Sequence, residues 1–560
     1  MARFSFDLEE LNGRNGLVID DASLALSLSS LTSSADYNDD GIDDLVIFPT
    51  SEDIFNQDIQ IIYGRERFPT DFNLDDASGS IISGSPNNLI SVPLSISELD
   101  FNGDGIDDLF TTGIEQSASG EVAFTARVFF GSDEFPGAIS SDSLNGTNGI
   151  EFVGDQSIFL AQSIDINGDN NDDLIISTID PEAVDSSALD SYVLLGDDRD
   201  FNATLDPTAL DGRNGFALES DSLSLSFALG AGDINDDGIN DLIVNSFGFG
   251  DGTNLEGIED IQSTSSIVFG GKTFPASIDA DNLGGDDGFN ITNSNPSAFE
   301  LITASIIEDA NGDGIADISV SLVSLDESEV EAIPDLSDTE ALEEQEDFGG
   351  SQRIFTIFGS ENLDGTLDIE DLDGDNGVEI INSAVDESSL VSSTTLDLNN
   401  DGFQDFVVRE EANSQTYVAF GKRNFNPTLD LADLNGRNGF AIAEEPDFVY
   451  TTSNVGDVNG DGIDDLILET DIDKTYVILG TEDDFRAEFK PTSRSANALV
   501  IFAQEPETTI TDIIDLNGDG ADDLIYEPGI ESDPFAFESE ISDVPGIQIV
   551  FGNSDLVPRA

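Results

Sequence analysis

Eight short stretches of the chain bring acidic and amide side chains together at a fixed spacing. One of them is DVNGDGIDDL, residues 457–466, in which Asp457, Asn459, Asp461 and Asp465 surround Gly462. A single stretch of this kind is also typical of a tight solvated turn, because Asp, Asn and Gly tolerate such backbone geometry. The pattern recurs from residues 36, 100, 165, 233, 309, 397, 457 and 515, however. Repetition in one register favours a shared chemical role over eight unrelated turns.

The ligand chemistry of this pattern suits calcium. Oxygen ligands at positions 1, 3, 5 and 9, with the carbonyl oxygen of position 7, form a cage for a hard cation of calcium size, whereas Mg²⁺ requires a rigid octahedron and keeps its waters. An EF-hand would need Glu at position 12, but Thr111 and Leu468 stand there in the second and seventh copies, and no helical pattern flanks either loop. We therefore predict about eight Ca²⁺, one per repeat, held in short loops between strands.

The predicted metal ligands occupy positions 1, 3, 5 and 9 of each loop. They are Asp36, Asn38, Asp40, Asp44, Asp100, Asn102, Asp104, Asp108, Asp165, Asn167, Asp169, Asp173, Asp233, Asn235, Asp237, Asp241, Asp309, Asn311, Asp313, Asp317, Asp397, Asn399, Asp401, Asp405, Asp457, Asn459, Asp461, Asp465, Asp515, Asn517, Asp519 and Asp523. Each set carries three negative charges and one neutral amide, so one Ca²⁺ relieves most of the repulsion among its carboxylates.

Composition excludes several classes of protein. The 560 residues carry a net charge of −99 and are 38% hydrophobic, which is enough for a real core but repels phosphate backbones and anionic lipid. Cys and His are both absent, which removes disulfides, thiol nucleophiles and the usual general base. No apolar stretch is long enough to span a bilayer, and the first residues lack a signal-peptide core. We expect neither nucleic-acid binding nor membrane insertion.

The loops mark an internal repeat of about 70 residues. Each loop is preceded by a strand rich in small residues, such as LSFALGAGD at 225–233, and followed by an apolar strand such as DDLILE. A third strand ends in a large residue and Gly, as in TYVAFG at 416–421, and a fourth follows a turn-rich segment. Four-stranded units repeated radially make a β-propeller, with the small-residue strand at the crowded axis.

The strand count also predicts how the ring closes. The chain begins with an outer-type strand at 16–19 and ends, at IQIVFG, one outer strand short. We predict that residues 16–19 complete the last blade, which leaves no open edge. The predicted fold is one all-β domain, residues 1–560, an eight-bladed propeller of four-stranded blades. Its approximate repeat units are 1–67, 68–134, 135–199, 200–272, 273–360, 361–423, 424–483 and 484–560.

The chain resembles the FG-GAP repeats of the integrin α-subunit propeller and of secreted bacterial integrin-like proteins. The resemblance rests on GDVNGDGIDDLIL at 456–468, GDINDDGINDLIV at 232–244, and the FG pairs that begin at Phe130, Phe269, Phe358, Phe420 and Phe551. It covers essentially the whole chain. It departs from the family in having eight units instead of seven and in lacking most copies of the GAP element, and neither departure touches the metal ligands.

The resemblance implies where function lies. In the family's geometry the connections between second and third strands lie on the face opposite the calcium loops, where integrins bind ligands. The longest such connection here, residues 325–350, has 11 acidic residues and no basic one. Residues 246–264 and 527–546 would join it on that face. A solvated flexible loop is the plainer interpretation of each segment, and a binding surface is the other.

We expect a non-enzymatic, calcium-stabilised extracellular or cell-surface propeller for adhesion or for matrix or filament assembly. Its partner would be a protein or glycan at the cell surface or in the matrix, or further copies of the chain. A carbohydrate-binding propeller is the alternative, although Trp is absent. A hydrolase is the third hypothesis, although carboxylates are so plentiful that pairs at glycosidase distance arise by chance and are no evidence for catalysis. The NGRNG motifs are interpreted as structural turns.

Overall fold

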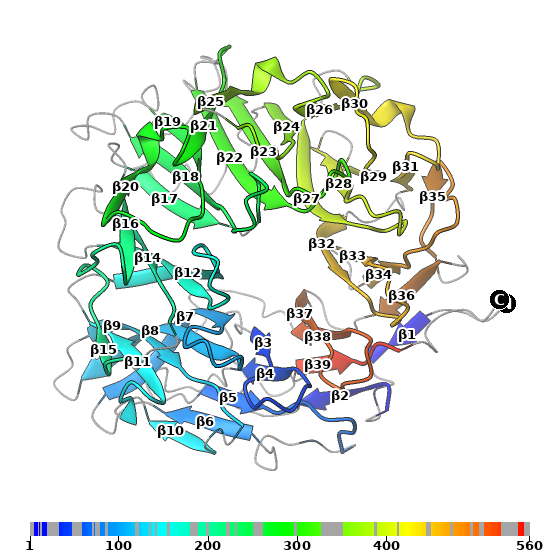
Figure 1. Ribbon diagram of the computed structural model, residues 1–560. Helices are drawn as coiled ribbons and strands as arrows, with labels where there is room; N and C mark the ends of the chain where they lie inside the picture. Colours follow the sequence, from blue (N-terminus) through cyan, green and yellow to red (C-terminus); the bar gives the residue numbers. More distant parts are fainter. Residues whose placement is uncertain are drawn as a thin grey trace, which may run out of the picture.

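The computed structural model describes residues 5–8, 11, 14–19, 33–47, 59–69, 72, 79–83, 88–117, 122–133, 135, 137–140, 143–153, 157–179, 189–197, 201–219, 224–229, 232–249, 261–295, 299–325, 351–363, 365–385, 389–411, 414–443, 450–470, 474–492, 497–502, 509–527 and 547–553. These residues form eight small β-sheets arranged around a common centre (Figure 1). The predicted all-β, eight-bladed propeller is confirmed.

Each blade has four antiparallel strands, which follow one another in order from the centre of the ring to its rim. In blades 1 to 4 they are β3 (Ser33–Ala35), β4 (Asp44–Ile47), β5 (Ile59–Ile62) and β6 (Gly79–Ser83); β7 (Asn88–Leu99), β8 (Asp108–Ser117), β9 (Val122–Phe129) and β11 (Gly149–Phe152); β12 (Ser157–Ile164), β13 (Asp173–Ile179), β14 (Leu189–Leu194) and β16 (Gly215–Glu219); and β17 (Ser224–Leu229), β18 (Leu242–Phe249), β19 (Ile261–Val268) and β21 (Gly288–Thr292). In blades 5 to 8 they are β22 (Phe299–Ile307), β23 (Asp317–Leu325), β24 (Ser351–Ile357) and β26 (Gly377–Ile381); β27 (Leu390–Leu396), β28 (Asp405–Glu410), β29 (Gln415–Ala419) and β31 (Gly439–Ile442); β32 (Tyr450–Gly456), β33 (Asp465–Thr470), β34 (Lys474–Ile478) and β36 (Ala498–Phe502); and β37 (Thr509–Ile514), β38 (Asp523–Glu527), β39 (Ile547–Val550) and β2 (Gly16–Ile19).

Blades 1 to 7 also have a fifth strand that the sequence did not predict. It pairs in parallel with the fourth strand and comes from the segment that leads to the outer strand of the following blade. In order of blade, these strands are β10 (Ala138–Ser140), β15 (Thr204–Leu205), β20 (Ser277–Asp279), β25 (Gly365–Asp368), β30 (Thr428–Asp430), β35 (Glu488–Phe489) and β1 (Ser5–Asp7). The 3₁₀ helices η6 (Ala280–Asn282), η7 (Ile369–Asp371) and η9 (Leu431–Asp433) follow three of them. Each of blades 1 to 7 is thus joined to the next blade by backbone hydrogen bonds.

The N-terminal strand closes the ring as predicted. Strand β2 pairs antiparallel with β39, with Gly16 opposite Val550 and Ile19 opposite Ile547. The preceding strand, β1, pairs with β36 of blade 7, so the N-terminal segment binds two C-terminal blades (Figure 1). Leu17 and Ile19 are buried in a cluster with residues of blades 1 and 8. Closure removes what would otherwise be an exposed edge of blade 8.

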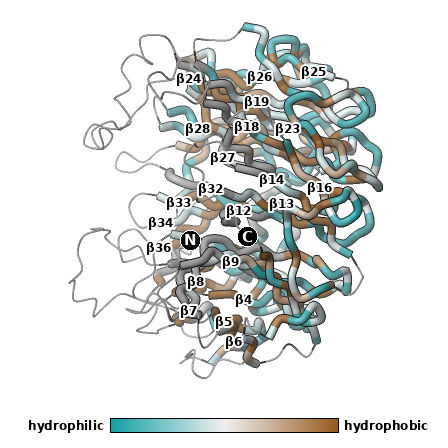
Figure 2. Tube along the Cα trace, turned by 90° about the vertical axis from the view of Figure 1, so that its left-hand side faces the viewer, coloured by the Kyte–Doolittle hydropathy of each residue, from teal (hydrophilic) through white to brown (hydrophobic). Residues whose placement is uncertain are grey.

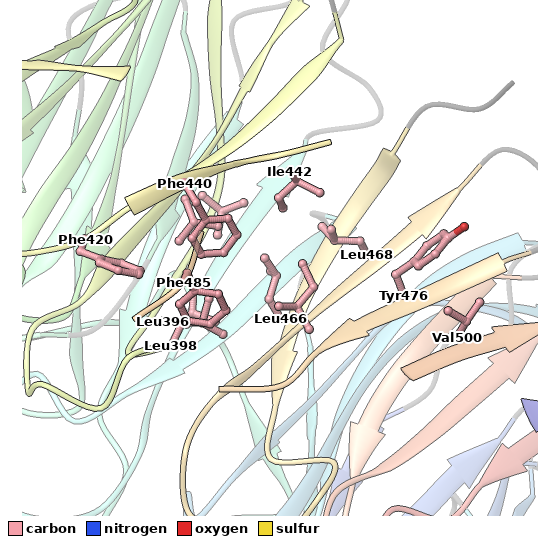
Figure 3. Packing of buried hydrophobic residues seen from close by; sticks show 13 residues of the cluster. Leu396, Leu398, Phe420, Phe440, Ile442, Leu466, Leu468, Tyr476, Phe485 and Val500 are labelled. Atoms are coloured by element: carbon pink, nitrogen blue, oxygen red, sulfur yellow. The ribbon is translucent and has the colours of Figure 1, made fainter. Parts of the chain in front are cut away.

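The hydrophobic core lies between blades, because each sheet is covered on both faces by its neighbours. Strand β33 is buried along five successive residues. Between blades 6 and 7, Phe440 stacks on Phe485 at 4.5 Å between ring centroids and lies beside Leu466 and Leu468 (Figure 3). Hydrophobic residues run through the strands, while hydrophilic residues gather in the turns (Figure 2).

The two ends of the blades carry different connections. The repeated loops join the first strand of each blade to the second, as residues 308–316 join β22 to β23. Because these strands are antiparallel, the second strand leads away to the opposite end of the blade, where β23 ends at Leu325 and β24 begins at Ser351. The connection between them, and most of the corresponding segments 246–264 and 527–546, lie outside the described residues.

Candidate metal-binding loops

All eight acidic loops share one backbone conformation. Position 4 has a φ between 53° and 75° in every loop, and position 6 has a φ between 66° and 91°. This left-handed region is open to Gly and, at modest cost, to Asn and Asp, and those are the residue types found at both positions. The restricted choice of residues at positions 4 and 6 is the sequence signal of this backbone requirement.

The carboxylate of position 1 lies at the centre of each loop. In the first loop, Asp36 accepts hydrogen bonds from the backbone N–H groups of Asp40 at 3.0 Å and Gly41 at 2.7 Å. The same pair of bonds is formed in the other seven loops. The carboxylate of position 5 accepts from the N–H of position 7 in all eight. These bonds close the turn, and the carboxylate oxygens keep further acceptor capacity.

The carboxylate of position 9 lies beneath the loop and is fully buried in every blade. In blade 6, Asp405 accepts from the N–H of Gly421 at 3.0 Å and from the N–H of Leu398 at 3.2 Å. Six of the eight loops also show the Asn of position 3 donating its side-chain N–H to this carboxylate. The structure therefore brings positions 3 and 9 into direct contact, and positions 1 and 5 into contact through the backbone.

The glycine two residues beyond each third strand belongs to the same site. In all eight blades its N–H donates to the buried Asp of position 9, at 2.8 to 3.0 Å. A Cβ atom at this glycine would overlap the carbonyl oxygen of position 8 in every blade. Glycine is thus required by a close backbone approach rather than by the turn. Its presence in all eight copies, as in FG or LG, was the available sequence signal.

Burial makes the position-9 carboxylates costly to ionise. It raises the pKa of Asp241 to about 7, of Asp44, Asp173, Asp317 and Asp465 to about 8, and of Asp405 and Asp523 to about 9, and it places the pKa of Asp108 well above the usual value. The amide donors oppose this rise, and the negative charges at positions 1 and 5 add to it. A cation in the loop would favour the ionised form.

The donor atoms suit a hard cation. Every side-chain group at positions 1, 3, 5 and 9 offers oxygen, and Oδ1 of Asn459 is buried with no hydrogen-bond partner. Buried oxygen acceptors almost always have a partner, so an unpaired one fits the role of a metal ligand. Among the described residues, no three acidic side chains already converge as a metal site. Besides the three Asp side chains, the predicted ligand set of each loop contains the amide oxygen of the Asn at position 3 and the backbone carbonyl of position 7. Calcium, if bound, would be held by these oxygens.

A cleft opens on the same face where the loops of blades 5, 6 and 7 meet. Its lining includes the carboxylates of Glu308, Asp309, Asp397 and Asp464. The Phe residues of the FG pairs, by contrast, are core residues: Phe130, Phe358, Phe420 and Phe551 are buried in the clusters between blades. None of the helices in the described ranges is long and apolar enough to cross a membrane.

Comparison with known proteins identifies no family. No family model matches the chain, and no curated protein matches its sequence. Solved structures with a similar chain course include the β-fructofuranosidase of Schwanniomyces occidentalis complexed with fructosyl-erythritol, at 8% identity and a TM-score of 0.24, covering 89% of this chain and 96% of that one. Another is the rhamnogalacturonan lyase YesW, at 10% identity and a TM-score of 0.29, covering 100% and 91%. Likenesses this weak carry no functional inference.

Proposed function

We propose that the protein is a calcium-stabilised, non-enzymatic extracellular propeller that serves cell-surface adhesion or the assembly of a matrix or filament. The observation that carries the calcium role is the shared backbone conformation of all eight loops around a buried carboxylate, which forms no ion pair with any described Lys or Arg. Eight copies of one site on one face favour a role in stabilising the fold over a role in catalysis, because a catalytic centre needs only one copy. The resemblance to FG-GAP repeats agrees with this proposal.

An extracellular location follows from the expected strength of such sites. Calcium sites of extracellular modules typically have dissociation constants of about 0.1 to 1 mM, so they fill where free calcium is millimolar. The sequence has no Cys, so metal ions would take the place that disulfides often hold in secreted proteins.

The binding surface is proposed for the face opposite the loops. The loops keep their ten-residue length, whereas connections between second and third strands range from the three residues between β33 and β34 to the 25 between β23 and β24. Variable connections on a rigid scaffold are where specificity usually resides. The acidic composition of residues 325–350 suits a cationic or calcium-bridged partner rather than an anionic one.

The test compares the full chain with a variant in which residues 325–350 are replaced by a short Gly-Ser linker. Both are measured for calcium content, melting temperature and binding to the surface of the producing cells, with calcium and with EDTA. We expect equal calcium content and melting temperature but altered cell binding in the variant. Lost folding with unaltered binding would place the functional face elsewhere.

Two parallel assays test the alternatives. Calcium-dependent binding to a glycan array in place of the cell surface would favour a carbohydrate-binding propeller. Turnover of chromogenic glycosides, abolished by substitution of carboxylates in the cleft between blades 5 and 7, would show a hydrolase.

A further inference from the structure

Position 8 of the loop contacts the neighbouring blade. In five loops it is an aspartate whose carboxylate accepts a hydrogen bond from the backbone N–H of position 1 in the preceding blade, with blade 1 following blade 8. The bonds are Asp36 to Asp107 at 2.9 Å, Asp100 to Asp172 at 2.9 Å, Asp397 to Asp464 at 3.0 Å, Asp457 to Asp522 at 2.6 Å and Asp515 to Asp43 at 3.3 Å. We call each such contact a clasp.

In two of the clasps, both backbone polar groups of the position-1 residue are hydrogen-bonded to the position-8 aspartate. The backbone N–H of Asp172 also donates to the carbonyl of Asp100 at 2.9 Å, and Asp522 does the same to Asp457 at 3.0 Å. Position 1 is the residue whose carboxylate organises its own loop. Its main chain is therefore fixed by the next blade, while its side chain fixes the turn.

The clasped carboxylates stand in an unfavourable electrostatic setting. Each of the five position-8 aspartates is partly buried and lies one hydrogen bond away from a position-1 residue that carries its own carboxylate, so two negative charges lie close together at each clasp. A cation in the preceding loop would offset their repulsion. The clasp thus joins two blades, and the repulsion between its two carboxylates depends on whether the preceding loop holds a cation.

Three of the eight seams have no clasp. Position 8 holds Asn240, Ala316 and Gln404 in blades 4, 5 and 6. Ala316 and Gln404 retain only the backbone bond, to the carbonyls of Asp233 and Asp309, and the Gln404 side chain donates to Glu308 instead. The five clasps therefore run unbroken from blade 6 through blades 7, 8, 1 and 2 to blade 3. This arc includes the junction between blades 8 and 1 that the two chain ends complete.

We propose that the position-8 aspartates are positioning residues that fix the first ligand of the preceding loop and so couple calcium binding in that loop to the docking of the next blade. The coupling extends along the arc from blade 6 to blade 3 and is absent between blades 3, 4, 5 and 6. It rests on the proposed calcium role of the loops. Coupling of this kind is reciprocal: the docked blade strengthens calcium binding, and calcium strengthens docking.

Amide hydrogen exchange read by mass spectrometry tests this proposal blade by blade. Asp107→Ala removes the acceptor from the Asp36 amide without touching a predicted ligand of either loop. We expect faster exchange in residues 33–47, and a calcium concentration for half-protection of that segment raised about tenfold, as for loss of a hydrogen bond to a charged acceptor. Residues 99–109, which contain the substituted loop, should change much less.

A matched control and a gain-of-contact variant complete the design. Asn240→Ala alters the same loop position at a seam without a clasp and should leave residues 164–174 unchanged. Ala316→Asp should protect the loop at 232–242, because Gly232 lies against Ala316 as Gly456 lies against Asp522, where a clasp exists. This variant keeps the proposal falsifiable if Asp107→Ala fails to fold.

The outcomes separate the two proposals. If calcium protects no loop of the unaltered protein, the calcium role fails, while exchange of residues 33–47 in metal-free protein still decides whether the clasp positions that segment. If calcium protects the loops but Asp107→Ala changes only its own loop or neither loop, the coupling is wrong. Equal effects of Asp107→Ala and Asn240→Ala on their preceding loops would also overturn it.

Discussion

At the scale of single residues, the buried Asp of position 9 is the centre of each repeat. It receives the amide of the glycine beyond the third strand, and in several blades an amide of its own loop, so it ties three segments of one blade together. The same burial penalises its charge when no cation is near. One residue therefore serves both the fold and the proposed metal site.

This arrangement predicts an unusual dependence of stability on pH in the metal-free protein. An unfolded Asp titrates near pH 4 (about 3.9), whereas the folded pKa of Asp405 is raised to about 9. Between these values the folded protein binds more protons than the unfolded chain, so the free energy of unfolding falls as pH rises. We expect the melting temperature to decrease from about pH 5 to about pH 9 without calcium, and this decrease to shrink or reverse with it.

Asp405→Asn tests the assignment to position 9. The variant should lose part of the decrease in metal-free buffer and should be less stable than the unaltered protein in saturating calcium. Asp133→Asn, at an exposed position, controls for the general effect of removing one negative charge. Similar pH profiles for the two variants would assign the effect to overall charge.

At the scale of elements, the N-terminal segment has a role out of proportion to its length. Strand β2 supplies the fourth strand of blade 8, and β1 supplies the fifth strand of blade 7. Leu17 and Ile19 are 3% and 1% exposed. Without this segment, β39 and β36 would present unpaired edges and the cluster between blades 8 and 1 would be incomplete.

Deletion of residues 1–20 should therefore cause aggregation or strand exchange between chains, measured by light scattering after size-exclusion chromatography. A synthetic peptide of residues 1–20 should restore part of the monomer. The milder variant Ile19→Ala should stay folded and lose about 2 to 4 kcal/mol of stability, as for other large-to-small core substitutions. A soluble, monomeric deletion variant with unaltered melting in calcium would contradict the closing role.

At the scale of the whole molecule, eight equivalent loops on one face make stability a collective property. With a dissociation constant of about 0.1 mM and free calcium of about 2 mM, each occupied site adds roughly 1.8 kcal/mol by mass action. That increment, repeated around the ring, is large beside the net stability of about 5 to 15 kcal/mol of a typical domain.

Chelation should consequently lower the melting temperature by more than about 10 °C, and metal analysis should find about eight Ca²⁺ per chain. Melting would be followed by calorimetry in calcium and after dialysis against EDTA, with Mg²⁺ as the control cation. An unchanged melting curve in EDTA, or fewer than about five Ca²⁺ per chain, would contradict the structural calcium role.

The sequence by itself determined the features that depend on neighbouring residues. The eight loops were visible because turn residues and ligands recur within ten positions. The four-stranded blades and the closing strand at Gly16–Ile19 followed from the order of apolar segments along the chain. These are local patterns, and strand pairing in a propeller follows chain order within each blade.

Only the tertiary structure decided what depends on approach between distant segments. The fifth strands are two to four residues long, too short to show an alternating pattern, and they form only where the rim of one blade meets the connection from the next. The glycine amide that meets the buried Asp and the clasp between Asp43 and Asp515 join residues from different strands or opposite ends of the chain. Strand pairing within a blade sets the first of these distances, and closing eight blades into a ring sets the second; no spacing along the sequence encodes either.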